Sequence, residues 1–166
     1  PRTFETYQNE IPLCFPGIDC AFWVSDAFDP RGFARNKYDI VSFCRMKEPE
    51  MLQNWTREVI HPYHFQYKLK LSNLQKNMLI SDSPYDYLTA YANACKVHTD
   101  LVHGTIISLS YGIPVKYYHD SLRSQVLESF DELTTDSEGF MHISESHVQQ
   151  SKSQMLSKLR RILESI

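Results

Sequence analysis

The stretch ACKVHTDLVHGTIISLSYGIPVKYYH, residues 94–119, decides the fold that the sequence predicts. Residues 96–99 form a short β-prone run, residues 101–111 are apolar on nearly every side, and residues 113–118 return to a strand pattern. Gly112 stands where a helix commonly ends in a left-handed residue. A helix this apolar must be covered on several sides, as the crossover of a buried parallel sheet is. The stretch therefore predicts strand, helix and strand.

The start of this predicted helix carries a candidate anion site. Thr99 and Asp100 are both good N-caps, which places His103 in the first turn, beside backbone N–H groups without an intrahelical acceptor. Such a helix end attracts anions. A histidine there resists protonation in an empty site, and an arriving phosphate or carboxylate favours its charged form. The alternative is that His103 is a polar residue at a helix start with no role in binding.

The same residues resemble a known family. The run TDLVHG at residues 99–104, followed by LSYGIPV at residues 109–115, is similar to the T-D-R-x-H-(A/G) … G-x-P-V signature of the polysaccharide pyruvyl transferases. A looser resemblance extends from about residue 2 to about residue 130. Within it, IDCAF at residues 18–22 resembles the family's D-P-A-F segment. The run YDIVSFCR at residues 38–45 resembles the first strand of the second lobe, which ends in an arginine.

The resemblance implies a two-lobed, GT-B-like enzyme whose signature lies in the C-terminal lobe. It implies that His103 grips the phosphate of phosphoenolpyruvate or acts as the acid, with Asp100 and Gly104 in the same anion-binding block. Arg45 is then a second clamp for the anion. The family carries an arginine two residues before the histidine, and this chain has Leu101 there.

Arg123 is a candidate replacement for that missing charge. Asp120 or Ser121 is expected to cap a helix that runs to about Leu133, with Arg123 in its first turn. A cation is unfavourable at the positive end of a helix dipole, which points weakly to an anion nearby. We therefore expect Arg123 to contribute to the anion site.

The function expected from the resemblance is transfer of pyruvyl from phosphoenolpyruvate to a sugar of a cell-surface polysaccharide, exopolysaccharide or capsule. Phosphoenolpyruvate is the donor substrate, no separate cofactor is expected, and the acceptor is a sugar or a lipid-linked oligosaccharide. Two alternatives remain. One is a GT-B nucleotide-sugar glycosyltransferase, although Glu128 lies too far into the next helix to grip a ribose. The other is a non-catalytic relative, in which Leu101 marks lost donor binding.

The composition excludes several classes of protein. The formal net charge of −3 argues against a nucleic-acid or membrane-surface protein. No apolar run approaches the length of a transmembrane segment. The four cysteines show no metal-like spacing, and free thiols suit a reducing cytoplasm. His61 and His64 are three residues apart, but Pro62 argues against a helix between them, so we predict no metal site.

Three segments are expected. Residues 1–37 are the tail of an upstream lobe and a linker, residues 38–143 are a C-terminal Rossmann-like lobe, and residues 144–166 are an amphipathic helix. Pro1 is not expected to be a natural start. We therefore expect an upstream N-terminal lobe as a partner of this one.

The remaining pattern predicts an α/β fold: a Rossmann-like, mainly parallel sheet with helices on both faces. Strands are expected at residues 38–44, 67–71 and 78–81, with an edge strand at residues 140–143. Helices are expected over residues 48–60, from Ser83 onward, and over residues 144–166. Residues 134–139 are expected to form a polar loop.

Overall fold

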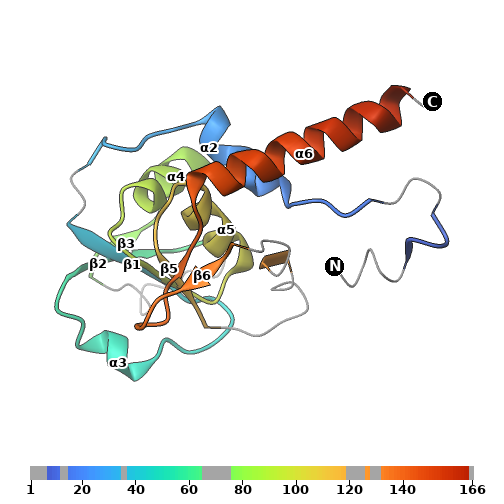
Figure 1. Ribbon diagram of the computed structural model, residues 1–166. Coiled ribbons are helices and arrows are strands. Elements are labelled where there is room, and N and C mark those ends of the chain that lie inside the picture. The colour runs from blue at the N-terminus through green and yellow to red at the C-terminus, as the bar shows by residue number, and fades with distance from the viewer. Residues whose placement is uncertain are drawn as a thin grey trace.

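The chain forms a seven-stranded, mainly parallel sheet in the computed structural model, which describes residues 7–11, 15–34, 37–64, 76–118, 126–127 and 132–164 (Figure 1). The strands lie in the order β3-β2-β1-β4-β5-β7-β6. Their bounds are β1 Tyr38–Ser42, β2 Glu58–Pro62, β3 Met78–Leu79, β4 Val97–Thr99, β5 Val115–Tyr117, β6 Thr134–Thr135 and β7 Met141–His142. Strands β1 to β5 pair in parallel, and β7 pairs antiparallel with both β5 and β6.

Helices flank the sheet on both faces, as the sequence predicted (Figure 1). One short helix, α3, lies on one side, and the longer helices lie on the other. The helical bounds are η1 Cys20–Trp23, α2 Val24–Ala27, α3 Glu50–Gln53, α4 Pro84–Ala92, α5 Val102–Ser110 and α6 Glu145–Glu164. The fold is Rossmann-like, with α5 as the crossover between β4 and β5.

The core lies between the three central strands and α5. Ile40, Val97 and Val115 come from β1, β4 and β5, and none of them is exposed. They form one cluster with Ile106 and Leu109 of α5. Burying large aliphatic side chains in this way stabilises a fold by about 1.5–3 kcal/mol each. The apolar helix of the central stretch is therefore where the sequence predicted it.

The C-terminus of α5 is a Schellman motif. Ile113 N donates to Ser108 O at 2.9 Å, and Gly112 N donates to Leu109 O at 3.0 Å. Gly112 has φ +74°, a left-handed conformation that glycine adopts without a steric penalty. This turn delivers the chain directly into β5.

The helix predicted over residues 48–60 is wrong beyond its first turn. Helix α3 ends at Gln53, and residues 58–62 form β2, which pairs in parallel with β1. Trp55 lies between them, and its Nε1 donates to the buried carboxylate of Asp39 at 2.5 Å. The apolar residues that suggested one helix belong to different elements: Leu52 lies in α3, and Val59 lies in β2. Val59 and Ile60 are β-branched and have a weak helical preference, which pairing with β1 outweighs.

The strands near the C-terminus also differ from expectation. Thr134–Thr135, predicted as part of a loop, forms the edge strand β6. Met141–His142 is a strand, as predicted, but it lies between β5 and β6 and not at the edge. The strand predicted at residues 67–71 lies outside the described residues, as does most of the helix predicted from Ser121 to Leu133.

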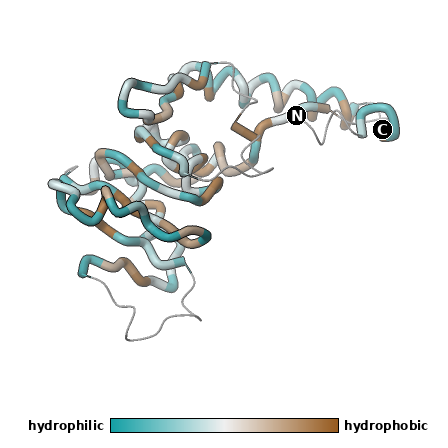
Figure 2. The backbone as a smooth tube through the Cα atoms, turned by 90° about the horizontal axis from the view of Figure 1, so that it is seen from below, coloured by the Kyte–Doolittle hydropathy of each residue, from teal (hydrophilic) through white to brown (hydrophobic). Residues whose placement is uncertain are grey.

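The predicted amphipathic helix is present as α6, and its two faces can be followed in Figure 2. Its first half packs on the body through Val148 and Lys152, which are 3% exposed. The ammonium of Lys152 donates to Asp26 Oδ1 at 2.8 Å, which ties α6 to α2. The far half extends away from the sheet (Figure 1).

Candidate functional site

The candidate site lies where the strand order of the sheet reverses. Chain connections from β1 lead to β2 on one side, while β4 lies on the other side and leads to β5. In open α/β sheets, ligands bind outside the carboxyl ends of the strands at such a switch point. Here those ends are followed by Cys44 and Arg45 after β1, and by Asp100 and the start of α5 after β4.

Asp100 joins these two strand ends. Its side chain is fully buried, and its carboxylate accepts hydrogen bonds from Cys44 N at 3.0 Å, Arg45 N at 2.6 Å and Met46 N at 2.8 Å. Hydrogen bonds to an ionised acceptor are stronger than neutral ones. The carboxylate therefore fixes the loop that carries Arg45.

The expectation that Asp100 caps the helix is wrong, because its carboxylate is taken up by this loop. The N-cap of α5 is Leu101, one residue later, and it makes no side-chain cap bond. Thr99 supports the turn, since its Oγ1 donates to Ser42 O at 2.9 Å and accepts from Leu101 N at 3.0 Å. His103 is consequently the second residue of α5, within its first turn.

A cavity of about 360 Å³ opens at this edge of the sheet. Its volume lies at the lower end of the range of small-molecule sites. Of the predicted site residues, Arg45, His103 and Gly104 lie together in its lining. Asp100 does not line the cavity but binds the backbone of Arg45. The full lining comprises Arg45, His64, Pro84, Tyr87, Leu88, Tyr91, Leu101, Val102, His103, Gly104, Ile107 and Tyr117. Arg123 lies outside the described residues.

His103 is accessible to a ligand. Its side chain is 66% exposed, and its Nε2 lies 4.0 Å from Asp19 Oδ2. Asp19 precedes η1 and caps it, with Oδ1 accepting from Ala21 N at 2.8 Å. The contact of η1 with α5 thus places a carboxylate beside an imidazole that is 84 positions away in the chain.

Gly104 allows α5 to begin very close to its neighbours. A Cβ at this position would lie 3.2 Å from Thr99 Oγ1 and 3.4 Å from the Tyr91 hydroxyl oxygen. Contacts at 3.2 Å are tighter than ordinary van der Waals packing, so a larger residue would push the helix start away. The glycine thus lets α5 begin beside the cavity, which its first residues line.

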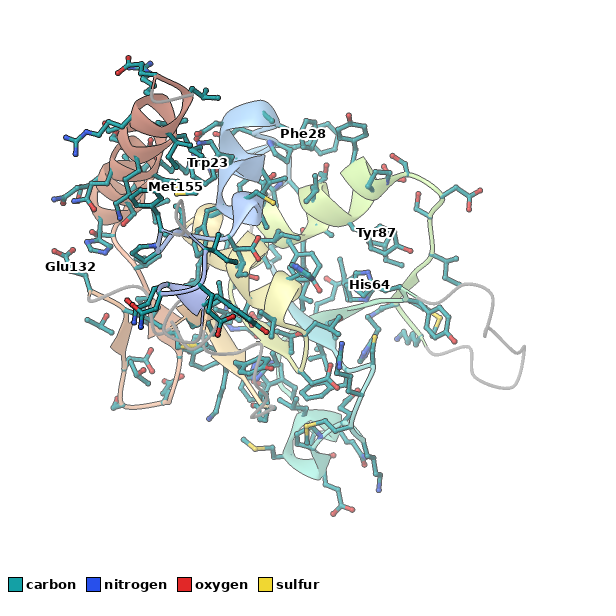
Figure 3. All side chains as sticks on the ribbon, turned by 90° about the vertical axis from the view of Figure 1, so that its right-hand side faces the viewer. Trp23, Phe28, His64, Tyr87, Glu132 and Met155 are labelled. Carbon is teal, nitrogen blue, oxygen red and sulfur yellow. The ribbon has the colours of Figure 1, made fainter. Side chains whose placement is uncertain are left out.

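Sequence reasoning missed the aromatic wall on the other side of the cavity. His64 follows β2, and its ring lies 5.0 Å from that of Tyr87 (Figure 3). His64 Nε2 lies 3.4 Å from the Tyr91 hydroxyl. Desolvation lowers the pKa of His64 and raises that of Tyr91, which keeps both groups neutral. Had residues 58–62 been predicted as a strand, the switch-point rule would have placed His64 at this edge.

The thiol nearest to the site is not an activated nucleophile. Burial, together with the charge of Asp100, raises the pKa of Cys44 to about 11. Reactive cysteines have a lowered pKa instead. Cys44 is therefore a protonated, inert thiol at neutral pH.

Metal ligation has no support in the described part of the chain, where no group of three or more His, Cys, Asp or Glu residues could hold an ion. His61, which the sequence paired with His64 at metal-like spacing, has its Nδ1 3.8 Å from Glu48 Oε2. Among the helices that the structure describes, none combines the length and apolar character needed to span a bilayer.

Comparison with known proteins gives no match to a family model, a curated protein or a solved structure.

Proposed function

We propose that the chain is a polysaccharide pyruvyl transferase-like lobe that binds phosphoenolpyruvate in this cavity. The observation that carries the proposal is that Arg45 and His103 line one cavity at the switch point, beside the start of α5. The two residues lie 58 positions apart, and both belong to segments that resemble the family. A permanent cation, an imidazole and helix-end N–H groups suit a ligand with a carboxylate and a phosphate close together.

The reaction gives each of these groups a task. Two hydroxyls of the acceptor sugar add to the carbon that carries the phosphate, the methylene carbon gains one proton, and inorganic phosphate leaves with the other. The product is a cyclic pyruvyl ketal. His103 serves as the acid or holds the phosphate, and Arg45 holds the second anionic group. The chemistry requires no cofactor beyond the donor, and the acceptor is a sugar or lipid-linked oligosaccharide of a surface polysaccharide, used in the cytoplasm.

A nucleotide-sugar glycosyltransferase is the second candidate. It is favoured by the aromatic wall of His64, Tyr87 and Tyr91, on which a nucleobase can stack. Against it, the described residues that line the cavity include no carboxylate to hold a ribose. A non-catalytic lobe is the third candidate, because Leu101 puts an aliphatic side chain at the start of α5.

Calorimetry with phosphoenolpyruvate, UDP-sugars and GDP-sugars separates these candidates, using the longest natural form of the protein. Phosphoenolpyruvate binding that is lost in His103→Ala supports pyruvyl transfer, and release of phosphate with a sugar acceptor completes the test. His142→Ala is the matched control, because that histidine lies on β7 and does not line the cavity. Binding of nucleotide sugars alone supports the glycosyltransferase. Binding of neither class, by a folded sample, rejects both enzymes.

A further inference from the structure

The charge around the cavity does not match the charge of the proposed donor. Among the described residues that line it, Arg45 is the one side chain with a permanent positive charge. Asp19, which lies beside His103, contributes a negative charge of the same size. Above about pH 6 a phosphate monoester carries two negative charges, and the donor's carboxylate adds a third. Bringing such an anion into a partly desolvated site without further positive charge is unfavourable.

Apart from the two histidines, the other titratable groups that the structure describes around the cavity supply no positive charge. The hydroxyl of Tyr87 donates to Tyr63 O at 2.9 Å, and desolvation raises the pKa of Tyr91. The thiol of Cys44 is protonated but neutral at physiological pH. Tyr117, the tyrosine that β5 contributes, has no positively charged form in water. Asp100 is committed to the backbone of the Arg45 loop.

The two histidines of the lining differ in the groups that lie beside them. His64 is also exposed, and the protein around its ring lowers its pKa by desolvation. His103 is 66% exposed, stands at the start of α5, and has the carboxylate of Asp19 at 4.0 Å from its Nε2. An anion held by Arg45 and the helix start would also lie next to it.

We propose that donor binding at this site is coupled to the uptake of one proton by His103, which provides the second positive charge. The proposal rests on the proposed function and adds to it a role for two residues. Among the described residues that line the cavity, Leu101 adds no charge at the helix start, so protonation of His103 makes the site pH-dependent. Affinity for phosphoenolpyruvate then weakens with rising pH, by up to about tenfold per pH unit for the one proton taken up.

Calorimetry at pH 7.5, in two buffers of different ionisation enthalpy, measures this proton directly. We expect the wild-type protein to take up about one proton per phosphoenolpyruvate bound. His103→Gln should bind more weakly and without uptake. His64→Gln is the matched control, because it removes the other imidazole of the same cavity, and it should retain the uptake.

A gain-of-charge variant tests the same point from the opposite direction. Leu101→Arg places a permanent cation at the N-cap of α5, so binding at pH 8.5 should tighten by about tenfold or more and the uptake should fall. Leu163→Arg is the control, because it adds the same charge at an exposed position on α6 that does not line the cavity, and it should bind phosphoenolpyruvate as the wild type does.

Three results would contradict either the proton-uptake inference or the proposed function. Wild-type binding without proton uptake overturns the inference and leaves the proposed function intact. Uptake that persists in His103→Gln also overturns it, because another group then carries the proton. If phosphoenolpyruvate binds neither the wild type at pH 6 nor Leu101→Arg, the proposed function fails and the inference fails with it.

Discussion

Asp100 holds the main chain of Arg45, with the carboxylate Oδ2 2.6 Å from Arg45 N. The two residues follow neighbouring parallel strands, and the same carboxylate binds the N–H groups on either side. A buried anion thereby sets the position of the cation that faces the cavity. The side chain that the sequence assigned to the anion site does not line the cavity and instead holds the backbone of Arg45, which does.

Asp100→Asn is expected to destabilise the protein. It removes the charge from three hydrogen bonds and turns an amide toward N–H donors, which should lower the free energy of unfolding by about 2–3 kcal/mol. Urea denaturation measures this loss. Glu164→Gln, at an exposed position near the end of α6, is the control and should change stability by less than about 0.5 kcal/mol. Equal stabilities of the two variants would show that the loop does not depend on the carboxylate.

Gly112→Ala is expected to cost about 1–2 kcal/mol of stability, through backbone conformation alone. The position has φ +74°, and a Cβ there would meet no atom within 4 Å. Gly112→Asn should cost less, because asparagine tolerates the left-handed region better. Thermal or urea unfolding of the two variants gives the comparison, and an alanine variant as stable as the wild type contradicts the Schellman geometry.

His98 should make the fold sensitive to acid. It is 1% exposed, its Nδ1 lies 2.9 Å from the Tyr118 hydroxyl, and its ring contacts Trp55 and Phe140. Desolvation first, and then the charges of Lys116 and Lys96, lower its pKa from 6.5 to about 4. The unfolded chain therefore binds a proton at a higher pH than the folded chain does.

It follows that the stabilising effect of a neutral His98 is complete above about pH 6.5 and is lost as the pH falls toward 4, by about 3 kcal/mol in total. Urea unfolding at pH 7 and pH 4.5 measures the loss. In His98→Gln the difference between the two pH values should shrink by about 2 kcal/mol. An unchanged difference would assign the acid sensitivity to the carboxylates. His142→Gln is the control, since that side chain is exposed and bonded to Asp136.

The Lys152–Asp26 pair should respond unequally to loss of its two members. The side chain of Lys152 is 3% exposed, whereas that of Asp26 is 43% exposed. Asp26→Ala leaves a buried ammonium without its partner and should cost about 2–3 kcal/mol. Lys152→Met removes the charge and keeps the apolar stem, so it should be neutral or stabilising. Urea unfolding of both variants checks this order, and a larger cost for Lys152→Met would reverse it.

Sequence reasoning succeeded where one segment carries the whole signal. The apolar run that became α5 and the glycine that ends it lie within a few residues of each other, and local periodicity and turn chemistry are enough to predict them. The same holds for Ser83 and Pro84, which precede and begin α4. The mainly parallel order followed because strands and helices alternate along the chain.

The errors occurred where distant contacts choose the structure. Glu58–Pro62 became a strand because β1 offers it a partner, and no local pattern reveals that partner. Asp100 looked like a helix cap, since its side chain can bind any nearby N–H group. In the folded chain it binds N–H groups of the loop after Ser42, which lies more than fifty residues earlier in the chain.

The sequence by itself determined the strand–helix–strand unit of residues 96–118 and the residue types at its edge, because these depend on side-chain periodicity and backbone freedom within one short segment. Only the tertiary structure decided that His103 lies beside Asp19, that Asp100 binds the backbone of Arg45, and that His64 and Tyr91 line the same cavity. Those relationships depend on which strand lies next to which, and pairing between strands is a property of the whole folded chain.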